Sequence, residues 1–212
     1  MTIAKPAPGT ADEPVPRQLG FDPNGTVDVR QVDDTFWMTL SPLTYGGQTQ
    51  EFSVPAAEKT DFASVPRVFV WFLPRYGRYT RAAILHDYLW RVEVPAGRIS
   101  RIDADGVFRR AMRELGVPFL RRWIMWAAVR WGALTKSDGR KGWWREAWRV
   151  VLVTLVALPI VAPAAALILI TILVFYAVEF LVWFPIELNR RLRKARRRPA
   201  KKVNKPVLRL KL

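Results

Sequence analysis

Apolar and polar positions first alternate in the segment that begins near residue 35. Within residues 36–40 every second side chain is apolar, which is the period of a strand with one buried face. The segment Tyr45-Gly46-Gly47-Gln48 then supplies a turn before a second short apolar run, from Glu51 to Val54. The pattern predicts a β-hairpin.

Three segments with helical spacing follow the predicted hairpin. Residues 78–91 place their apolar side chains on one face. A second helix is predicted to begin at the capping pair Ser100 and Asp103, and Gly116 with Pro118 should end it. Residues 119–134 form the third helical pattern. The domain is therefore predicted to be small and α+β, with a β-hairpin and about three helices.

The third predicted helix carries both large apolar and basic side chains. Ile124, Ala127 and Trp131 recur on one side of it, and Arg130 lies elsewhere on its surface. The tryptophans of this helix either pack in a core or rest on a membrane surface.

An apolar run near the C-terminal end indicates a membrane segment. From Val150 to Val178 there is no charged residue, which exceeds the run of about 20 needed to cross the hydrocarbon. Thirteen residues between 164 and 184 are Leu, Ile, Phe or Val. Each favours insertion by about 0.3 to 0.6 kcal/mol, whereas Glu179, near the end of the run, opposes it by at most about 3 kcal/mol.

The path of this segment through the membrane has alternatives. Pro159 and Pro163 interrupt the run, and basic residues flank it on both sides. The positive-inside rule would place both flanks in the cytoplasm, which favours a re-entrant helical hairpin that turns near these prolines. A single apolar helix with the tail outside is the second alternative, and an external domain with a cytoplasmic tail is the third.

Charge is concentrated after the apolar run. The net charge is +16, and residues 189–212 contain twelve basic residues and no acid, so the rest of the chain carries only +4. Each Lys or Arg near anionic lipid contributes about 1 kcal/mol, so we expect the tail to bind anionic head groups. The residues closest to the membrane segment are Arg190, Arg191, Arg193, Lys194, Arg196, Arg197 and Arg198. Nucleic-acid binding through the tail is less favoured, because aromatic residues are not interleaved with the charges.

These features divide the chain into four parts. Residues 1–34 are rich in proline and glycine and are predicted to be a disordered arm. Residues 35–145 form the α+β domain, residues 146–188 the membrane segment, and residues 189–212 a basic cytoplasmic tail. The chain has no cysteine and a single histidine, which excludes disulfides, cysteine nucleophiles and multi-histidine metal sites.

Two motifs and a dipeptide carry a family resemblance. They are Thr60-Asp61-Phe62-Ala63-Ser64-Val65-Pro66, Arg81-Ala82-Ala83-Ile84-Leu85-His86-Asp87, and Ala104-Asp105. In this order they resemble the phage and prophage family of domain of unknown function 1353, over about residues 36–144. The resemblance implies a viral or prophage gene and work at the host envelope, but no established activity.

The chain departs from its relatives at two places around the first motif. Many relatives have glycine after the Thr-Asp pair, where this chain has Phe62. A glycine-aromatic pair that often precedes the loop is replaced here by Ala56-Ala57-Glu58-Lys59.

The motifs contain the candidate catalytic residues Asp61, Ser64, His86, Asp87 and Asp105. A histidine beside carboxylates can act as a general base, with Ser64 as its nucleophile. Neighbours on a helix are about 100° apart, so His86 and Asp87 cannot both point straight into one narrow site. In the structural alternative, Asp61 and Ser64 cap a turn, and His86 is buried and satisfied by Asp61 or Asp105.

We predict that His86 lies close to Asp61 and is at least partly buried. No cofactor is predicted, and a divalent metal bound by His86 and Asp61 is a weaker alternative. Asp105 and Arg109 are four residues apart on a predicted helix, so they are expected to form a surface pair.

The sequence as a whole favours a non-enzymatic phage or prophage accessory protein, anchored in the host inner membrane with its main domain in the cytoplasm. Its expected partners are anionic lipid and other phage or host envelope proteins. One alternative is a membrane-tethered hydrolase that uses His86 and the nearby aspartates. The other is a holin-like lysis protein, in which the apolar segment is the active part.

Overall fold

The computed structural model describes residues 18–63, 65–137, 139–195 and 204–207. Within them, strands form two three-stranded antiparallel sheets. One sheet has the order β1 (Gly20–Phe21), β4 (Leu43–Gly46) and β5 (Glu51–Val54), and the other β2 (Val29–Gln31), β3 (Trp37–Thr39) and β6 (Lys59–Thr60). With the helices, they confirm the predicted α+β class.

The predicted hairpin is formed by β4 and β5. Tyr45 pairs with Phe52 across it, and the Gly47 N–H donates to the Gln50 carbonyl over 3.0 Å at the turn. Its first strand is residues 43–46 and not 36–40, because Pro42 lacks an N–H and separates the two segments. Residues 37–39 form β3, which pairs with β2 and β6.

Part of the predicted disordered arm is ordered. β1 and β2 both lie within it, and Phe21 of β1 is buried with its ring centroid 4.9 Å from that of Tyr45. This aromatic contact and the strand pairing of β1 with β4 stabilise the segment. Residues 1–17 of the arm lie outside the described residues.

The helical pattern of the sequence is confirmed in the domain. The helices are α1 (Thr80–Tyr88) with a π-helical continuation (Leu89–Glu93), α2 (Arg101–Glu114) and α3 (Phe119–Ala133). α2 begins as predicted, since the Ser100 hydroxyl accepts the Asp103 N–H over 3.2 Å. It ends before Gly116, whose φ of +70° suits the residue after a helix.

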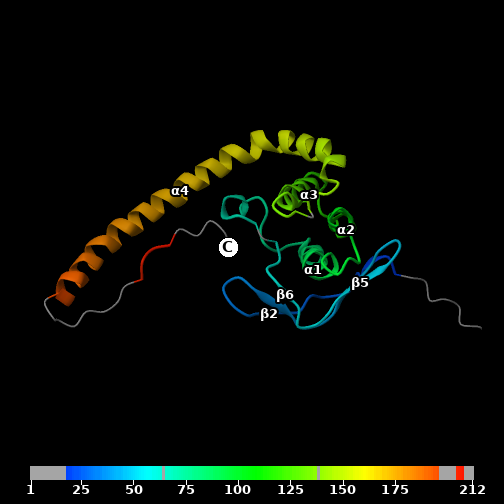
Figure 1. Cartoon of the computed structure of the whole chain (residues 1–212), viewed down its shortest axis with the longest axis horizontal. Coiled ribbons are helices and arrows are strands. Elements are labelled where there is room, and N and C mark those ends of the chain that lie inside the picture. Colours follow the sequence, from blue (N-terminus) through cyan, green and yellow to red (C-terminus); the bar gives the residue numbers. More distant parts are fainter. Residues whose placement is uncertain (1–17, 64, 138, 196–203, 208–212) are drawn as a thin grey trace, which may run out of the picture.

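The elements stack in the order sheets, α1, α2, α3 and α4, as Figure 1 shows. The main core lies between the sheets, α1 and α2. Its fully buried side chains include Tyr45, Val54, Ile84, Leu85, Leu89 and Met112. Each large apolar side chain buried there contributes about 1.5 to 3 kcal/mol.

The buried face of α3 is not simply the apolar side of its pattern. Trp126, Ala127 and Arg130 are buried, whereas Trp131 is 42% exposed. Trp126 and Ala127 pack in a second core with Trp143, which precedes α4. Arg130 can be buried because a buried carboxylate on α2 pairs with it.

Helix α4 (Ala147–Ala195) is continuous, so the re-entrant hairpin is not formed. Pro159, Pro163 and Pro185 lie inside it. Proline removes a single backbone hydrogen bond and bends a helix, whereas a hairpin turn would leave several backbone groups without partners in an apolar segment. Figure 1 shows α4 bending as it leaves the domain.

The two parts of α4 have different surroundings. Near its start, Val150 is buried, and the Trp131 Nε1–H of α3 donates to Thr154 Oγ1 over 2.9 Å. Farther along, none of the residues of its most apolar stretch is buried. Of the helices in the described residues, α4 alone is long and apolar enough to cross a membrane.

Candidate functional site

His86 and Asp105 meet between α1 and α2. His86 Nε2 lies 2.7 Å from Asp105 Oδ1, and the Trp90 Nε1–H donates to the same oxygen over 2.8 Å. The imidazole packs against Phe108 with ring centroids 4.6 Å apart, and 13% of the side chain is exposed. Of the two partners considered for His86, the structure places Asp105 against it.

Asp105 also pairs with Arg130, which the sequence did not suggest. The Arg130 Nη1–H donates to Asp105 Oδ2 over 2.9 Å, and both side chains are fully buried. The expected surface pair of Asp105 with Arg109 is therefore wrong, because Asp105 faces α1 and α3. The sequence feature that could have indicated burial of Arg130 is its helical spacing from Trp126 and Ala133, which are both buried.

The network continues to the start of α4. Arg130 Nε lies 3.4 Å from Glu146 Oε2, and the Trp143 Nε1–H donates to the Arg130 carbonyl over 2.8 Å. Asp105 is the centre of this network, since its two oxygens interact with three donors from three elements. Loss of one partner of such a buried ion pair leaves an uncompensated charge and costs about 3 to 5 kcal/mol.

Asp87 points to different neighbours. It accepts hydrogen bonds from Arg91 over 2.9 and 3.1 Å, and Arg91 also pairs with Glu58 at 3.1 Å. Burial raises the pKa of Asp87, Arg91 opposes the rise, and the Asp61 charge adds to it. A hydrogen bond with the Thr60 side chain also lowers the pKa. Asp87 and Arg91 thus attach α1 to the segment around β6.

The five candidate residues are therefore divided. His86 and Asp105 form one network, while Asp87 and Asp61 are electrostatically coupled in another. Ser64 lies outside the described residues. No group of three or more His, Asp or Glu side chains with metal-ligand spacing occurs within the part of the chain that the structure describes.

The chemistry open to His86 is set by its contacts. Its Nε2–H donates to a carboxylate that already pairs with an arginine, an arrangement that fixes the ring in place. Such a satisfied buried pair connects helices, and it supplies a general base only if a substrate reaches the other ring nitrogen.

Comparison with known proteins gives a family. The model of the family described as protein of unknown function (DUF1353) matches residues 37–129. The resemblance to this family that the motifs indicate is confirmed over these residues. No curated protein and no solved structure matches the chain.

Among the described residues, two non-glycine residues have left-handed backbone conformation. They are Ala57, with φ of +65°, and Phe62, with φ of +59°. Phe62 is buried, and its ring centroid is 5.5 Å from that of Trp37. The loop thus has a backbone conformation that favours glycine, and the Phe62 side chain adds to the core.

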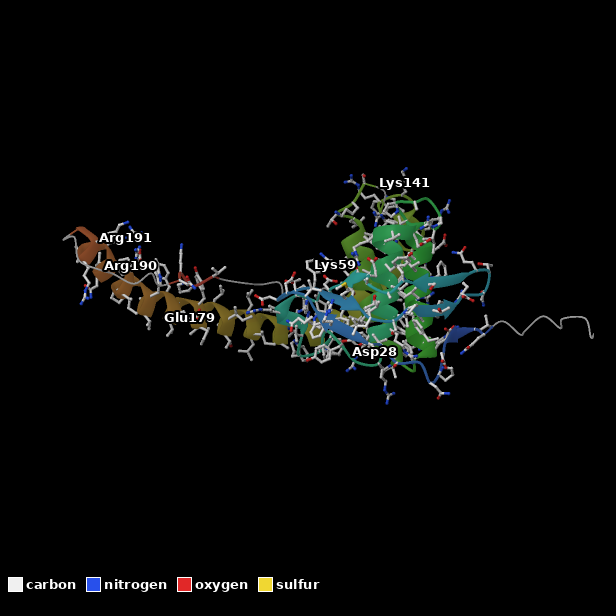
Figure 2. The ribbon with its side chains drawn as sticks, turned by 90° about the horizontal axis from the view of Figure 1, so that it is seen from below. Asp28, Lys59, Lys141, Glu179, Arg190 and Arg191 are labelled. Atoms are coloured by element: carbon white, nitrogen blue, oxygen red, sulfur yellow. The ribbon has the colours of Figure 1, made fainter. Side chains whose placement is uncertain are left out.

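The basic residues at the end of α4 are only partly available to lipid. The Arg190 Nε–H donates to Glu187 over 2.6 Å and the Arg191 Nε–H over 3.0 Å. Arg193 and Lys194 are exposed, and Arg196, Arg197 and Arg198 lie outside the described residues. Figure 2 shows Arg190 and Arg191 at the end of α4 that is farthest from the domain.

Sequence reasoning missed a pocket on the outer face of α2. It has a volume of about 920 Å³ and is lined by α2, the β4–β5 turn, the segment before α2 and the start of α3. Five arginines line it, namely Arg98, Arg109, Arg110, Arg113 and Arg122, with the carboxylates Asp103 and Glu146. The signal was the helical spacing of Gly106, Arg109, Arg110 and Arg113, which places a small residue and three arginines on one face.

Proposed function

We propose that the chain is a membrane-anchored, non-enzymatic accessory protein of a phage or prophage. In this proposal α4 crosses the host inner membrane and holds the DUF1353 domain at its surface. The phage setting is what the family resemblance implies. The observation that carries the anchor is the exposure of apolar side chains all along α4 beyond its first turns.

The apolar surface of α4 supports a membrane location. Leu167, Phe175 and Leu181 are each 65 to 70% exposed, and similar residues are exposed on every side of the helix. Soluble monomers rarely expose continuous apolar patches of more than a few hundred Å². A helix that is apolar all round requires hydrocarbon or a protein interior around it.

The length of α4 fits a single membrane crossing that is preceded by a helical segment at the membrane interface. Residues 164–184 would span about 30 Å at 1.5 Å per residue, which matches the hydrocarbon thickness. The preceding residues 147–158 contact α3, and their outer face exposes Trp148, Leu152 and Leu155. Tryptophan beside leucine suits the membrane interface.

A single crossing also separates the domain from the tail. Moving twelve basic residues out of the cytoplasm would work against the membrane potential, at about 2.3 kcal/mol per charge per 100 mV. We therefore place the tail in the cytoplasm and the domain on the opposite, envelope-facing side. The sequence favoured a cytoplasmic domain for two reasons: the hairpin, which α4 does not form, and the export of residues 1–145 that the opposite orientation requires.

The His86 network supports a non-enzymatic domain. Asp105 is fully buried and engaged with His86, Trp90 and Arg130, so its oxygens are committed to holding α1, α2 and α3 together. We infer that the domain presents a surface to envelope components, while its signature residues stabilise the fold.

Membrane anchoring is tested by extraction. The full chain should stay with membranes in high salt and in alkaline carbonate, because apolar burial is insensitive to screening. Removal of residues 196–212 should weaken binding to anionic vesicles and leave the chain in the carbonate pellet. Recovery of the full chain in the supernatant would disprove the anchor.

Orientation is tested by cysteine labelling, for which the cysteine-free chain is well suited. Ser53→Cys introduces an exposed thiol in the domain and Asn204→Cys one in the tail. A membrane-impermeant maleimide should label Ser53→Cys in spheroplasts and Asn204→Cys only after lysis. The reverse labelling pattern would place the domain in the cytoplasm, with α4 still crossing the membrane.

Two further measurements separate this function from the alternatives. If the phenotype of the gene requires His86 while His86→Gln folds and localises normally, the hydrolase becomes the better function. If residues 147–212 alone kill cells as the full chain does, the holin-like function is favoured.

A further inference from the structure

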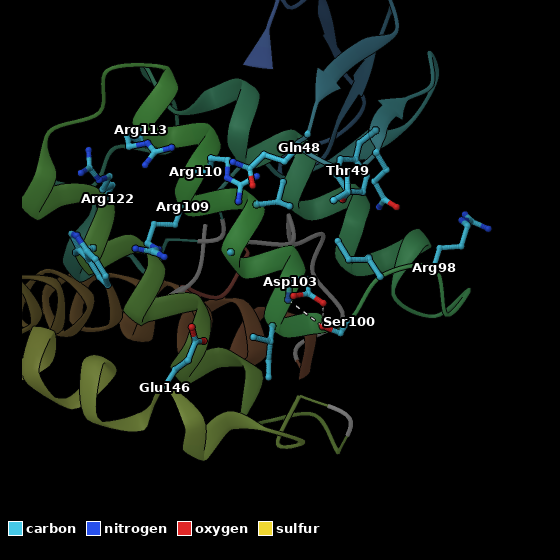
Figure 3. A pocket seen from close by; sticks show the side chains of 18 of the residues that line it. Gln48, Thr49, Arg98, Ser100, Asp103, Arg109, Arg110, Arg113, Arg122 and Glu146 are labelled. Atoms are coloured by element: carbon cyan, nitrogen blue, oxygen red, sulfur yellow. Dashed lines mark hydrogen bonds between the residues drawn. The ribbon is translucent and has the colours of Figure 1, made fainter. Parts of the chain in front are cut away.

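Five arginines line the α2 pocket, and four of them lie close together. Figure 3 shows Arg109, Arg110, Arg113 and Arg122 gathered at one end of it, with Arg98 at the other. Arg98 is held by Glu93 over 2.6 and 2.8 Å, but the other four form no ion pair with a carboxylate in the described part of the chain. With five arginines and two carboxylates, the lining has three net positive charges.

Two of these guanidinium groups are fixed by aromatic rings. Arg109 lies over Trp123 at 4.3 Å from the ring centroid, and Arg122 lies over Phe119 at 5.1 Å. Stacking covers the face of a guanidinium and leaves its in-plane N–H groups for other acceptors. Burial lowers the pKa of Arg109, the Glu146 charge opposes this, and the nearby charges of Arg149, Arg122 and Arg113 add to the lowering.

Neutral groups complete the lining of the pocket. Gln48, Thr49 and Gln50 of the β4–β5 turn bring amide and hydroxyl donors. A Cβ atom added to Gly106 would meet nothing within 4 Å, so the surface of α2 is open there. The volume of about 920 Å³ is within the range of small-molecule sites.

We propose that this pocket binds a phosphate-bearing ligand, with Arg110 and Arg113 as its principal charge partners and Arg109 and Arg122 as fixed donors. Guanidinium groups bind phosphate in a bidentate manner, and several of them around one cavity favour a group with two or more negative charges. This goes beyond membrane attachment, because the site would exist whether or not α4 crosses a bilayer.

The phosphate can come from two sources. Glu146 lines the pocket and directly precedes α4, so a phospholipid head group in the adjacent leaflet could reach it if α4 is the anchor. A soluble phosphate compound would enter from water. The chemistry is the same, and the two sources are separated by the probe used.

The test uses the full chain in phosphatidylcholine nanodiscs, with tryptophan fluorescence and thermal unfolding as readouts. Pyrophosphate, compared with chloride at equal ionic strength, is the soluble probe. Phosphatidic acid, compared with a fatty acid at equal surface charge, is the lipid probe. Saturable binding of at least one phosphate probe is expected, and the probe that binds identifies the source.

The variant Arg110→Gln/Arg113→Gln should weaken this binding at least about tenfold, because each lost charged contact contributes on that order. Neither side chain pairs with a described carboxylate, so unfolding without ligand should change little. Arg110→Lys/Arg113→Lys keeps the charge, loses the bidentate geometry and should bind less well than the wild type.

The matched control is Arg30→Gln/Arg140→Gln, which removes two exposed charges outside the pocket. It should bind within about twofold of the wild type, far less than the loss expected from charged contacts in the pocket. Equal weakening in both double variants would mean that overall charge attracts the probe, and would overturn the site. Absence of saturable binding for both probes would overturn it as well.

Discussion

Helices α3 and α4 pack against each other, yet they distribute charge and apolar surface in opposite ways. α3 buries Arg130 completely, within a domain that supplies Asp105 as its partner. Beyond its first turns α4 buries almost nothing and exposes large apolar side chains instead. The domain therefore contains its own polar and apolar partners, whereas α4 needs an apolar environment from outside.

The largest effect should follow from separating the two regions. Deletion of residues 164–212 should move the protein almost completely from the membrane pellet to the soluble fraction, because it removes the exposed apolar stretch. The remaining domain should keep its cooperative thermal unfolding, since the core lies between the sheets and α1 to α3. A truncated protein that remains in the carbonate pellet would show that the domain or the first turns of α4 suffice.

The next effect concerns the buried charge of α3. Asp105→Asn should lower the free energy of unfolding by about 3 to 5 kcal/mol, because it leaves the buried Arg130 charged, with only the more distant Glu146 as an ionic partner. Denaturant unfolding in mild detergent, followed by tryptophan fluorescence, measures this loss.

Asp103→Asn is the control for Asp105→Asn, because it removes one carboxylate from the same helix at an exposed position. It should cost at most about 1 kcal/mol, as expected of a cap. Similar losses in the two variants would contradict the role of the buried pair.

The periodic parts of the fold could be predicted from the sequence. The capping pair at Ser100 and the stop at Gly116 gave the bounds of α2. The turn at Gly46-Gly47 gave the hairpin and its second strand, although the first strand was placed at residues 36–40. Strands of two or three residues, such as β1 and β2, carry too short a pattern, and only their tertiary partners stabilise them.

The candidate site was less accessible to prediction. The motifs of the family resemblance brought His86 and Asp105 forward as candidates, but they could not choose between Asp61 and Asp105 as the histidine's partner. No partner for Arg130 was apparent from the sequence. Arginine is almost never fully buried unless it is paired, and this pair spans two helices. The α2 pocket combines four separate segments, and only the α2 face had a pattern in the sequence.

The third effect is a pH dependence at the junction of α1 and β6. The pKa of Asp87 is raised, mainly by burial. The Asp87 carboxyl therefore binds a proton more tightly in the folded state than in the unfolded state. The stability that the protonated carboxyl contributes is lost as the pH rises through its folded pKa. As the pH is lowered toward 3.8, the wild type should gain stability relative to Asp87→Asn, measured by denaturant unfolding.

The contribution of Asp33 to stability should change with pH in the opposite direction. Its carboxylate accepts the Phe36 and Thr35 backbone N–H groups, both over 2.8 Å, and these bonds lower its pKa. The stability that the Asp33 carboxylate contributes is present above pH 3.8, which is its pKa in the unfolded chain. This stability is lost as the pH falls through the lower pKa of the folded state. The wild type should thus lose stability relative to Asp33→Asn in acid. If acid changed the stability difference from wild type in the same direction for both variants, burial of Asp87 and the backbone hydrogen bonds to Asp33 could not be the causes.

The smallest effect concerns Ala57, an exposed residue held at φ of +65°. Its N–H donates to the Thr39 carbonyl over 2.8 Å, and the Thr39 N–H donates to the Glu58 carbonyl over 3.0 Å, which fixes the turn. A left-handed residue with a Cβ costs about 1 to 2 kcal/mol, whereas glycine loses about 0.5 to 1 kcal/mol of chain entropy. Ala57→Gly should therefore raise the free energy of unfolding by about 0.5 to 1 kcal/mol.

Ala56→Gly is the matched control, since Ala56 is also exposed but has no positive φ. It should lower stability by up to about 1 kcal/mol, because only the entropy loss applies. Phe62→Gly relieves the same backbone strain, but it should destabilise the domain, because a buried aromatic ring contributes about 1.5 to 3 kcal/mol. If Ala57→Gly destabilised the domain as much as Ala56→Gly, the left-handed turn would carry no backbone strain.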